Sequence, residues 1–378
     1  MESEIVRWLL CLMQITAFAY LLLLMVYTIG WYRTPSSPPL LNANHPKVHV
    51  LIALRNESLQ IDALVQSLQD QVYPSDRLLF VLVDDHSEDD TFIRLEQAVK
   101  AKMSHQFLVL QAEKPGKKAS LQQALRHEAA DLIVVTDADC IHSPFWIAQL
   151  AAHYVRDKAV MCLGPVKISP IESLMQQLQA LEFMSLIAST AGAAGLGIPS
   201  MANGANMAID YNALMKAGGF NQKTQYASGE DVFLLLKLLQ TYGSKKIRFV
   251  RSAHAMVTTQ ASPDWKSFMS QRMRWVSKSK AYRHPFIILP ALIVFALNFS
   301  LVALSIAMIW IPYLSIIFLL FILVKYLIEL PLMQSMANFM HSRKLLRWFL
   351  PMQFFYPFYV VITAIAGLGF KSSWKGRT

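Results

Sequence analysis

The chain has 378 residues, of which 54% are hydrophobic and only 16% are charged. This balance argues against a wholly soluble protein and fits one soluble domain joined to several membrane spans. The formal net charge is +10, but many basic residues flank apolar segments, as Arg33 and Arg283 do, so anionic lipid headgroups explain the charge better than nucleic acid.

The first predicted element is an apolar run from Trp8 to Trp31, long enough to cross a hydrocarbon core of about 30 Å. A cleaved signal peptide is the alternative, but the run exceeds a usual signal core and lacks a clear small-residue cleavage site before Arg33. Residues 1–33 are therefore predicted to be a retained anchor. Residues 34–46, which include two prolines at 38 and 39, are predicted to be an extended linker.

From residue 47 to 261 short apolar strands alternate with amphipathic helices, which predicts an α/β domain with a mostly parallel sheet. The clearest strands are Val48–Leu54, Leu78–Val83, Phe107–Leu110 and Leu132–Thr136. Open sheets of this kind bind ligands at the carboxyl ends of their strands. Arg55, Glu57, Asp84, Asp85, Lys118, Asp137 and Asp139 follow these ends and are expected to line one cleft.

Asp137 and Asp139 lie one residue apart after an apolar strand, so their carboxylates can reach Mg²⁺ or Mn²⁺ on one side and a ribose or phosphate on the other. An Asp-Ala-Asp sequence alone is more often a structural turn. Lys117 and Lys118 fit either a phosphate contact or a solvated surface pair.

Two acidic stretches also fit helix capping. Residues 87–90, Ser-Glu-Asp-Asp, are predicted to be a capping box, with Ser87 and Asp90 in the capping roles. Residues 228–231, Ser-Gly-Glu-Asp, fit a second capping box before an apolar run. A capping role would place the Asp231 carboxylate at a helix N-terminus, where a negative charge is favoured.

Residues 262–283 are predicted to form an amphipathic helix at the membrane surface, with Trp265, Phe268 and Met269 facing lipid. In a helix Gln271, Arg274 and Trp275 share one face and present an amide, a cation and an aromatic ring, a set that suits an anionic, sugar-bearing ligand. A basic amphipathic helix without a catalytic role is the alternative.

Residues 284–378 are predicted to hold two spans, separated near Trp310–Pro312, and a third apolar segment from Phe349 to Phe370. Arg33 and Arg283 favour a cytoplasmic catalytic domain. Three full spans would then place Lys371, Lys375 and Arg377 outside, so a re-entrant or interfacial third segment is favoured over a third span.

The ordered motifs Asp84-Asp85, Asp137-Ala138-Asp139, Gly229-Glu230-Asp231 and Gln271-Arg272-Met273-Arg274-Trp275 resemble those of membrane-bound family 2 glycosyltransferases of GT-A fold, the branch with ceramide glucosyltransferases and the cellulose, chitin and hyaluronan synthases. The resemblance covers roughly residues 48 to 275. It implies an inverting hexosyltransferase that uses a nucleotide diphosphate sugar, with a UDP-hexose as the expected donor, and a divalent metal.

The resemblance also implies roles for individual residues. Asp139, with Asp137, would bind the metal, and Asp231, with Glu230, would supply the base. Arg55, Glu57, Asp84, Asp85, Lys118 and Asp137 would bind the nucleotide or donor, and Gln271, Arg274 and Trp275 would bind the diphosphate or acceptor.

The expected protein is thus a multi-pass membrane enzyme with a cytoplasmic catalytic domain, in the inner membrane if the source is bacterial, acting on a lipid acceptor and not on nucleic acid. A processive polysaccharide synthase with a glycan acceptor is the first alternative. A non-catalytic membrane scaffold is the second.

Overall fold

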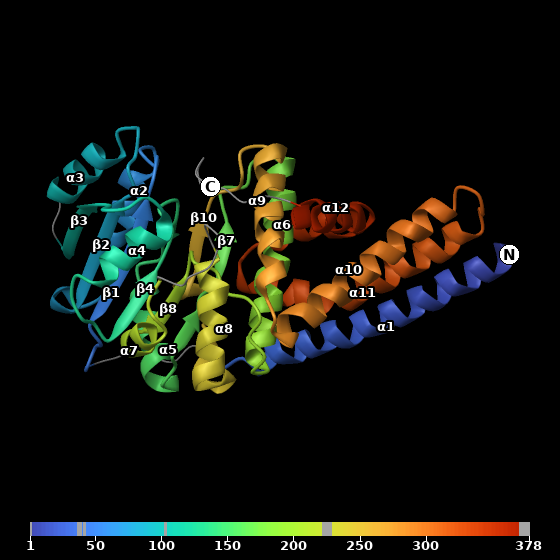
Figure 1. Ribbon diagram of the computed structural model, residues 1–378, viewed down its shortest axis with the longest axis horizontal. Coiled ribbons are helices and arrows are strands. Elements are labelled where there is room, and N and C mark those ends of the chain that lie inside the picture. The colour runs from blue at the N-terminus through green and yellow to red at the C-terminus, as the bar shows by residue number, and fades with distance from the viewer. Residues whose placement is uncertain (1, 36–39, 41–42, 102–103, 221–228, 370–378) are drawn as a thin grey trace. The chain divides into compact units, whose positions relative to one another are not determined.

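The computed structural model describes the chain except for residues 1, 36–39, 41–42, 102–103, 221–228 and 370–378 (Figure 1). Its residues form two compact units. Unit 1 takes its described residues from Met1–Arg33, Ile171–Leu196 and Ala261–Lys371, and unit 2 from Thr34–Pro170 and Gly197–Gln260. Ile171–Leu196 lies inside the range predicted for the catalytic domain but belongs to unit 1, with the apolar helices.

Unit 2 is built on a seven-stranded sheet of order β3-β2-β1-β4-β8-β6-β9. The strands are β1 (Val48–Leu54), β2 (Leu78–Asp84), β3 (Gln106–Gln111), β4 (Leu132–Val135), β6 (Met161–Leu163), β8 (Met207–Asp210) and β9 (Ile247–Phe249). β1 pairs in parallel with β2 and β4, and β2 with β3, whereas β8 is antiparallel to β4 and β6. The predicted mostly parallel sheet is confirmed, and the four predicted strands end within one residue of the observed ones.

Helices cover this sheet, which explains why all residues of β1 and β2 are buried and why all of them except His49 and Asp84 are apolar. The helices are α2 (Ile61–Gln69), α3 (Thr91–Ala101), α4 (Lys117–Leu125), α5 (Trp146–Asp157), α7 (Tyr211–Lys216) and α8 (Glu230–Tyr242), with short 3₁₀ turns η1 (Ser75–Arg77), η2 (Ser244–Lys246) and η3 (Ala253–Ala255). A second sheet joins β5 (Ile141–His142), β10 (Val257–Thr259) and β7 (Val166–Ile168).

The described part of unit 1 is helical. It contains α1 (Glu2–Arg33), α6 (Leu174–Gly195), α9 (Trp265–Ser277), α10 (Pro285–Ala307), α11 (Leu314–Phe339) and α12 (Phe349–Gly369), with η4 (Lys278–Ala281) and η5 (Arg343–Trp348). In Figure 1 α1, α10 and α11 run side by side, and α12 packs on α9 and α10. Four segments, Val6–Arg33, Pro285–Ala307, Leu314–Phe339 and Arg343–Gly369, are long and apolar enough to cross a membrane.

Two sequence-based expectations about unit 1 can be compared with these helices. α12 is one unbroken helix through Pro357, so residues 349–369 contain no re-entrant turn, and the basic residues after it lie outside the described part. The small residues of Ala191–Gly197 predict a flexible loop or a close-packed turn. This prediction is wrong for most of the segment, because α6 continues to Gly195.

The small residues of α6 let α1 approach it closely. A Cβ atom built on Gly192 would lie 2.4 Å from the carbonyl oxygen of Tyr27, and one built on Gly30 would lie 1.9 Å from the carbonyl oxygen of Gly192. Neither distance is compatible with a side chain. The two glycines therefore set the spacing of the helices, as small residues do where apolar helices cross.

A buried polar cluster joins α1, α11 and α12. The carboxylate of Glu329 accepts hydrogen bonds from Tyr20 Oη at 2.5 Å and from Gln353 Nε2 at 2.7 Å, and Lys325 Nζ lies 2.5 Å from it. Lys325 also donates to Gln353 Oε1 at 2.6 Å. Each charge in the cluster has a partner of opposite sign or a hydrogen bond, as burial in an apolar bundle requires.

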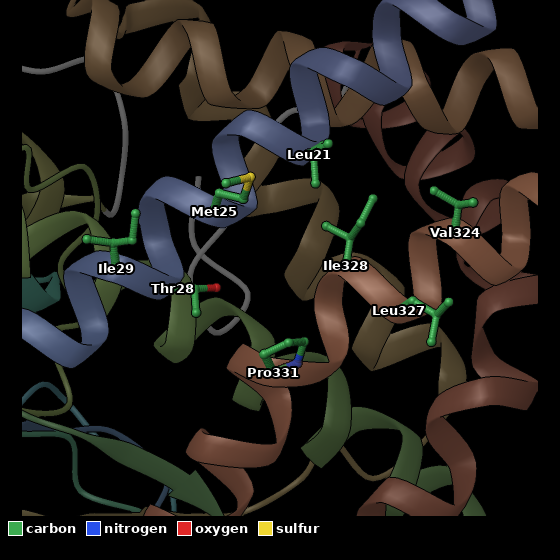
Figure 2. Close-up of a pocket in the computed structure, with 8 residues that line it drawn as sticks. All are labelled: Leu21, Met25, Thr28, Ile29, Val324, Leu327, Ile328 and Pro331. Atoms are coloured by element: carbon green, nitrogen blue, oxygen red, sulfur yellow. The ribbon is translucent and has the colours of Figure 1, made fainter.

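An apolar groove lies between α1 and α11 (Figure 2). It is lined by Leu21, Met25, Thr28, Ile29, Val324, Leu327, Ile328 and Pro331. Thr28 is the one lining residue with a polar side chain, and its hydroxyl donates to the Leu24 carbonyl at 2.7 Å, within α1. Beyond the groove, Trp31 Nε1 donates to Ser335 Oγ at 2.6 Å and holds the two helices together.

We expect Gly192→Ala to destabilise the protein, although replacing glycine by alanine inside a helix usually stabilises it by about 0.5–1 kcal/mol. Overpacking of a tight contact typically costs about 1–3 kcal/mol. Thermal unfolding in detergent measures the difference. Gly369→Ala is the matched control, because a Cβ there meets nothing within 4 Å; equal melting temperatures for the two variants would contradict the close α1–α6 crossing.

Candidate active site

The polar residues predicted from the sequence follow β1, β2 and β4 at one edge of the unit 2 sheet. These strands are parallel neighbours, so their carboxyl ends lie together. Leu54 pairs in register with Asp84, which puts Arg55 and Asp85 at the same level of the edge. This part of the predicted cleft follows directly from the sheet topology.

Asp84 and Asp85 are buried and held by donors from their own surroundings. The Asp84 carboxylate accepts from the Ser87 hydroxyl at 2.5 Å and from the Ser87 amide at 3.2 Å. The Asp85 carboxylate accepts from the Gly116 amide at 2.9 Å, and its other oxygen lies 3.1 Å from His86 Nδ1. Both carboxylates are thus fixed in position by the protein itself.

The loops after β1 and β2 are bonded to each other. Arg55 is buried and its Nη2 lies 3.1 Å from Glu88 Oε1, on a side chain that is largely exposed. Three backbone amides after β1 donate to side-chain oxygens after β2. The bonds run from Asn56 N to Ser87 Oγ, from Glu57 N to Thr91 Oγ1 and from Ser58 N to Asp89 Oδ2. Arg55 and Glu57 are therefore brought next to the segment that follows Asp84 and Asp85.

The predicted capping box at residues 87–90 is not what the structure contains. α3 begins at Thr91, and it is Asp89 that accepts from the Thr91 amide at 3.1 Å. The Ser87 hydroxyl is instead bonded to Asp84. The Ser87 hydroxyl therefore bonds to the end of β2 instead of capping α3.

Asp137 and Lys117 form an ion pair at the same edge. Lys117 Nζ, from the first residue of α4, donates to Asp137 Oδ1 at 2.5 Å. The Asp137 side chain is 36% exposed, so it remains accessible to a ligand. Lys118, which was predicted to bind the donor, lies in the same first turn, and that role stays a prediction.

Asp139 lies deeper than Asp137. Its Oδ2 accepts from the Thr259 hydroxyl at 2.9 Å. Burial, and next the nearby Asp137 carboxylate, raise the pKa of Asp139. The neighbouring Cys140 is also buried, and burial raises the pKa of its thiol.

The two carboxylates are chemically suited to a hard divalent cation, because they are oxygen ligands that concentrate negative charge in one place. Among the described residues no group of three or more His, Cys, Asp or Glu side chains could hold a metal. Mg²⁺ in nucleotide sites is commonly held by one or two carboxylates together with substrate phosphates and water. Asp137 and Asp139 fit that pattern.

Asp231 is the second residue of α8, at the helix N-terminus where a carboxylate is favoured. The N-cap is Gly229, in a left-handed conformation with φ of 100°. Ser228, which was predicted to cap this helix, lies outside the described residues, as does the side chain of Glu230. The Asp231 carboxylate accepts from its neighbour Val232 N at 2.8 Å and from Gly204 N at 3.3 Å.

Gly204 connects Asp231 to the carboxylates at the sheet edge. A Cβ atom built on Gly204 would lie 3.6 Å from Lys117 Nζ, the atom that binds Asp137. Asp137, Lys117, Gly204 and Asp231 therefore follow one another in space, although they come from four separate segments of the chain.

A buried histidine supports this part of the sheet. His142 lies 2.9 Å from Thr136 Oγ1 and 3.0 Å from Ser67 Oγ, one contact at each ring nitrogen. Burial lowers the pKa of His142 to about 3, so the ring is neutral. His142 is thus a structural histidine with a contact at each ring nitrogen.

The Gln271–Trp275 motif lies on α9, in unit 1. The predicted helix is present and begins after Asp264, whose side chain accepts from Ser267 N at 2.7 Å. Phe268 was expected to face lipid, but it is buried and stacks on Tyr359 of α12 with ring centroids 5.7 Å apart. Trp265 remains more than half exposed.

Arg272, which the sequence did not single out, is the buried centre of this motif. Its Nε and Nη2 bind the two carboxylate oxygens of Glu182 on α6 at 3.1 and 2.5 Å, and Tyr359 donates to the same carboxylate at 3.1 Å. Gln271 accepts from Arg272 Nη1, and the Trp275 ring lies 4.2 Å from the guanidinium carbon. Glu182 was the available signal, because it is a lone acid in an apolar helix and needs a partner.

The structure thus brings together Arg55, Glu57, Asp84 and Asp85 in one set of loops. It links Asp137 to Asp231 through Lys117 and Gly204, and Asp139 lies near Asp137. Gln271, Arg274 and Trp275 lie on one helix of unit 1, and two of them contact Arg272 there. The ligand roles assigned to all of these residues stay predictions.

Comparison with known proteins identifies a family. The family described as "Glycosyltransferase like family 2" matches residues 45–278, more than half of the chain. Over 239 residues the chain is 27% identical to a probable glycosyltransferase, YdaM, of Bacillus subtilis, covering 61% of this chain and 54% of that protein. It is 28% identical over 149 residues to an undecaprenyl-phosphate 4-deoxy-4-formamido-L-arabinose transferase of Klebsiella pneumoniae, covering 39% and 45%. The chain thus spans about half the length of the relatives it matches.

A solved structure has the same fold. It is a mannosyltransferase from Pyrobaculum calidifontis, in complex with GDP-mannose and Mn²⁺, and the alignment covers 97% of this chain and 99% of that one. The TM-score is 0.62 at 17% sequence identity. The predicted GT-A fold with helices at both ends is confirmed.

Glu182→Gln should destabilise the protein strongly, because it leaves the buried Arg272 without its counter-charge, a change that typically costs about 3–5 kcal/mol. Thermal unfolding of the purified protein measures this. The double variant Glu182→Gln with Arg272→Met removes both charges and should recover much of the loss. A melting temperature unchanged by Glu182→Gln alone would show that the pair is not formed.

Proposed function

The chain belongs to the family 2 glycosyltransferases, and from this premise we propose that it transfers a hexose, with inversion, from a UDP-hexose to the hydroxyl group of a membrane lipid. The observation that carries the proposal is the spatial series Asp137, Lys117, Gly204 and Asp231. It puts a candidate base close to carboxylates and a cation suited to a diphosphate. A donor and an acceptor can then meet in one place.

On the donor side, Asp84 and Asp85 accept hydrogen bonds from the base or ribose, with Arg55 and Glu57 beside them at the nucleotide. Lys118, with Lys117, lies at the N-terminus of α4, where backbone amides and a lysine favour phosphate. Asp139 and Asp137 would hold Mg²⁺ or Mn²⁺. When bound, such a cation offsets the negative charge that develops on the departing diphosphate.

At the reaction centre, the acceptor oxygen attacks the anomeric carbon while the bond from that carbon to the diphosphate oxygen breaks. Asp231 takes the proton from the acceptor hydroxyl, and UDP leaves with the bonding electron pair. Glu230, the preceding residue in α8, is the second acidic group of this motif. Its position in the sequence supports a role beside Asp231.

The acceptor is proposed to be a lipid because four helices fit a membrane and because one relative is named as an undecaprenyl-phosphate sugar transferase. Gln271, Arg274 and Trp275 are proposed to bind the diphosphate or the acceptor. We further propose a cytoplasmic catalytic domain, which lies at the inner membrane if the source is bacterial. This arrangement is supported by the basic residues that flank the apolar segments.

The first test is turnover. UDP-glucose, UDP-galactose and UDP-N-acetylglucosamine are each incubated with the full-length protein and a native membrane lipid extract, and UDP release and lipid mass are measured. One added hexose on an extractable lipid is expected. A long water-soluble chain would indicate the processive synthase instead, and the absence of UDP release with every donor would favour a non-catalytic scaffold.

Asp139→Asn should weaken metal-dependent binding of UDP, because an amide removes a charge from a site for a hard cation. Calorimetric titration of UDP with and without Mn²⁺ measures the effect. Thr259→Val is a matched control: it removes the hydroxyl bonded to Asp139 but keeps the carboxylate. UDP affinity that stays high and Mn²⁺-sensitive in Asp139→Asn would contradict the metal assignment.

Asp231→Asn should keep binding UDP and metal but lose transfer by roughly 10²-fold or more, the usual contribution of a general base. The measurements are kcat for transfer, UDP affinity and the melting temperature. Near-normal turnover in the folded variant would count against Asp231 as the base. It would also point to an acceptor whose attacking oxygen carries no proton, such as a phosphate monoester.

A further inference from the structure

The turn formed by residues 203–206 holds one backbone amide against Asp231. Within the turn the Asn203 side chain accepts from Ala205 N at 3.0 Å, and Asn206 N donates to the Asn203 carbonyl at 3.1 Å. These bonds fix the direction of the amide between them. That amide is Gly204 N, which donates to Asp231 Oδ2 at 3.3 Å.

Hydrogen bonds to buried residues also hold the 203–206 turn in place. The buried Thr136 hydroxyl donates to the Ala205 carbonyl at 2.8 Å. The Asn206 side chain donates to two main-chain carbonyls, those of Pro165 and Ala255, each at 2.8 Å, and accepts from Trp146 Nε1 at 2.9 Å. The Gly204 amide is therefore presented by a framework that is already satisfied and packed.

Asp231 is bonded through both of its carboxylate oxygens, to Val232 N in its own helix and to Gly204 N in the turn. The first bond restrains the side chain only relative to α8. The second restrains it relative to β4, because the turn is bonded to Thr136, the residue directly after that strand. β4 is also the strand that leads into Asp137 and Asp139.

We propose that the backbone amide of Gly204 is a positioning group for the reaction: it holds the Asp231 carboxylate at a fixed place relative to the donor-side carboxylates. This inference rests on the proposed function, in which Asp231 accepts the proton. Displacing a base by about 1 Å can cost roughly 10²-fold in rate. The 3.3 Å bond is long, as such bonds often are before the substrate binds.

The residue at position 204 allows a sharp test because its amide and its side chain can be changed separately. A Cβ there would meet only Lys117 Nζ, at an ordinary contact distance of 3.6 Å. Gly204→Ala therefore adds a methyl group and keeps the amide hydrogen. Gly204→Pro removes that hydrogen and with it the bond to Asp231.

The experiment compares kcat for UDP release with UDP-glucose, UDP-galactose or UDP-N-acetylglucosamine and a native lipid extract. We expect kcat of Gly204→Pro to lie about 10- to 100-fold below that of Gly204→Ala, the range expected for one hydrogen bond to a charged group. UDP affinity in the presence of Mn²⁺ and the apparent KM for the lipid should be similar in the two variants. A purely structural defect would change these as well.

A double-mutant cycle separates positioning from general damage. If the Gly204 amide acts through Asp231, then Gly204→Pro should cause no further loss in an Asp231→Asn background. Thr136→Val is a second route to the same group, because it removes the hydroxyl bonded to Ala205 while leaving the main chain of the turn intact. That hydroxyl also contacts His142 Nε2, so Ser67→Ala, which removes the contact at the other ring nitrogen, is the matched control. Thr136→Val should lower kcat in the wild type and not in Asp231→Asn.

The outcomes distinguish this inference from the function on which it rests. Full turnover in Asp231→Asn overturns both. If Asp231→Asn is inactive but Gly204→Pro and Gly204→Ala have equal kcat, the positioning role alone is overturned. Should Gly204→Pro fail to fold, Thr136→Val decides: a loss of kcat that is additive with Asp231→Asn overturns the inference, and a non-additive loss supports it.

Discussion

The ion pair between Lys117 and Asp137 is the contact on which the rest of the site depends. Parallel strands bring several carboxylates to one edge of the sheet, and like charges at such distances repel one another. The protein offsets this with backbone amides at Asp85 and Asp231, with hydroxyl groups at Asp84 and Asp139, and with the ammonium group of Lys117 at Asp137. Because Lys117 also lies next to Gly204, that one ammonium group lies between the donor-side carboxylates and the candidate base.

Unit 1 meets a different physical problem, which is to join helices that have little polar surface. Contacts between apolar side chains alone define the position of a helix poorly. The helix positions are set instead where glycines allow close main-chain contact, as between α1 and α6, and where a buried charge is paired with one of opposite sign. The Glu182–Arg272 pair fixes α9 against α6, and Tyr359 adds α12 to the same carboxylate. The rotation of the helix that carries Gln271, Arg274 and Trp275 is therefore determined by a residue between them.

Local sequence pattern predicted β1, β2 and β4 almost to the residue, because these buried strands are apolar apart from His49 and end at or just before the polar residues Arg55, Asp84 and Thr136. The same pattern predicted which carboxylates share an edge. Local pattern could not predict the ion pair between Glu182 and Arg272, because the two residues are 90 positions apart and the residues around each do not identify its partner. Nor could it predict the hydrogen bond from the Gly204 amide to Asp231, because every residue except proline has a backbone N–H. The turn-like composition of Ala191–Gly197 was misleading, since small residues also allow two helices to cross closely.

The cluster around Glu329 has a consequence for how the protein is made. Tyr20 and Glu329 are 309 residues apart. At a synthesis rate of roughly 5–20 residues per second, Glu329 is therefore made about 15–60 s after Tyr20. α1 carries no charged residue between Trp8 and Tyr32 and can enter the bilayer alone in that interval. α11 arrives with Lys325 and Glu329 one turn apart, so its two charges neutralise each other within the same helix before either meets α1. The order of translation thus lets each helix enter the lipid at low electrostatic cost, and the shared hydrogen bonds form last.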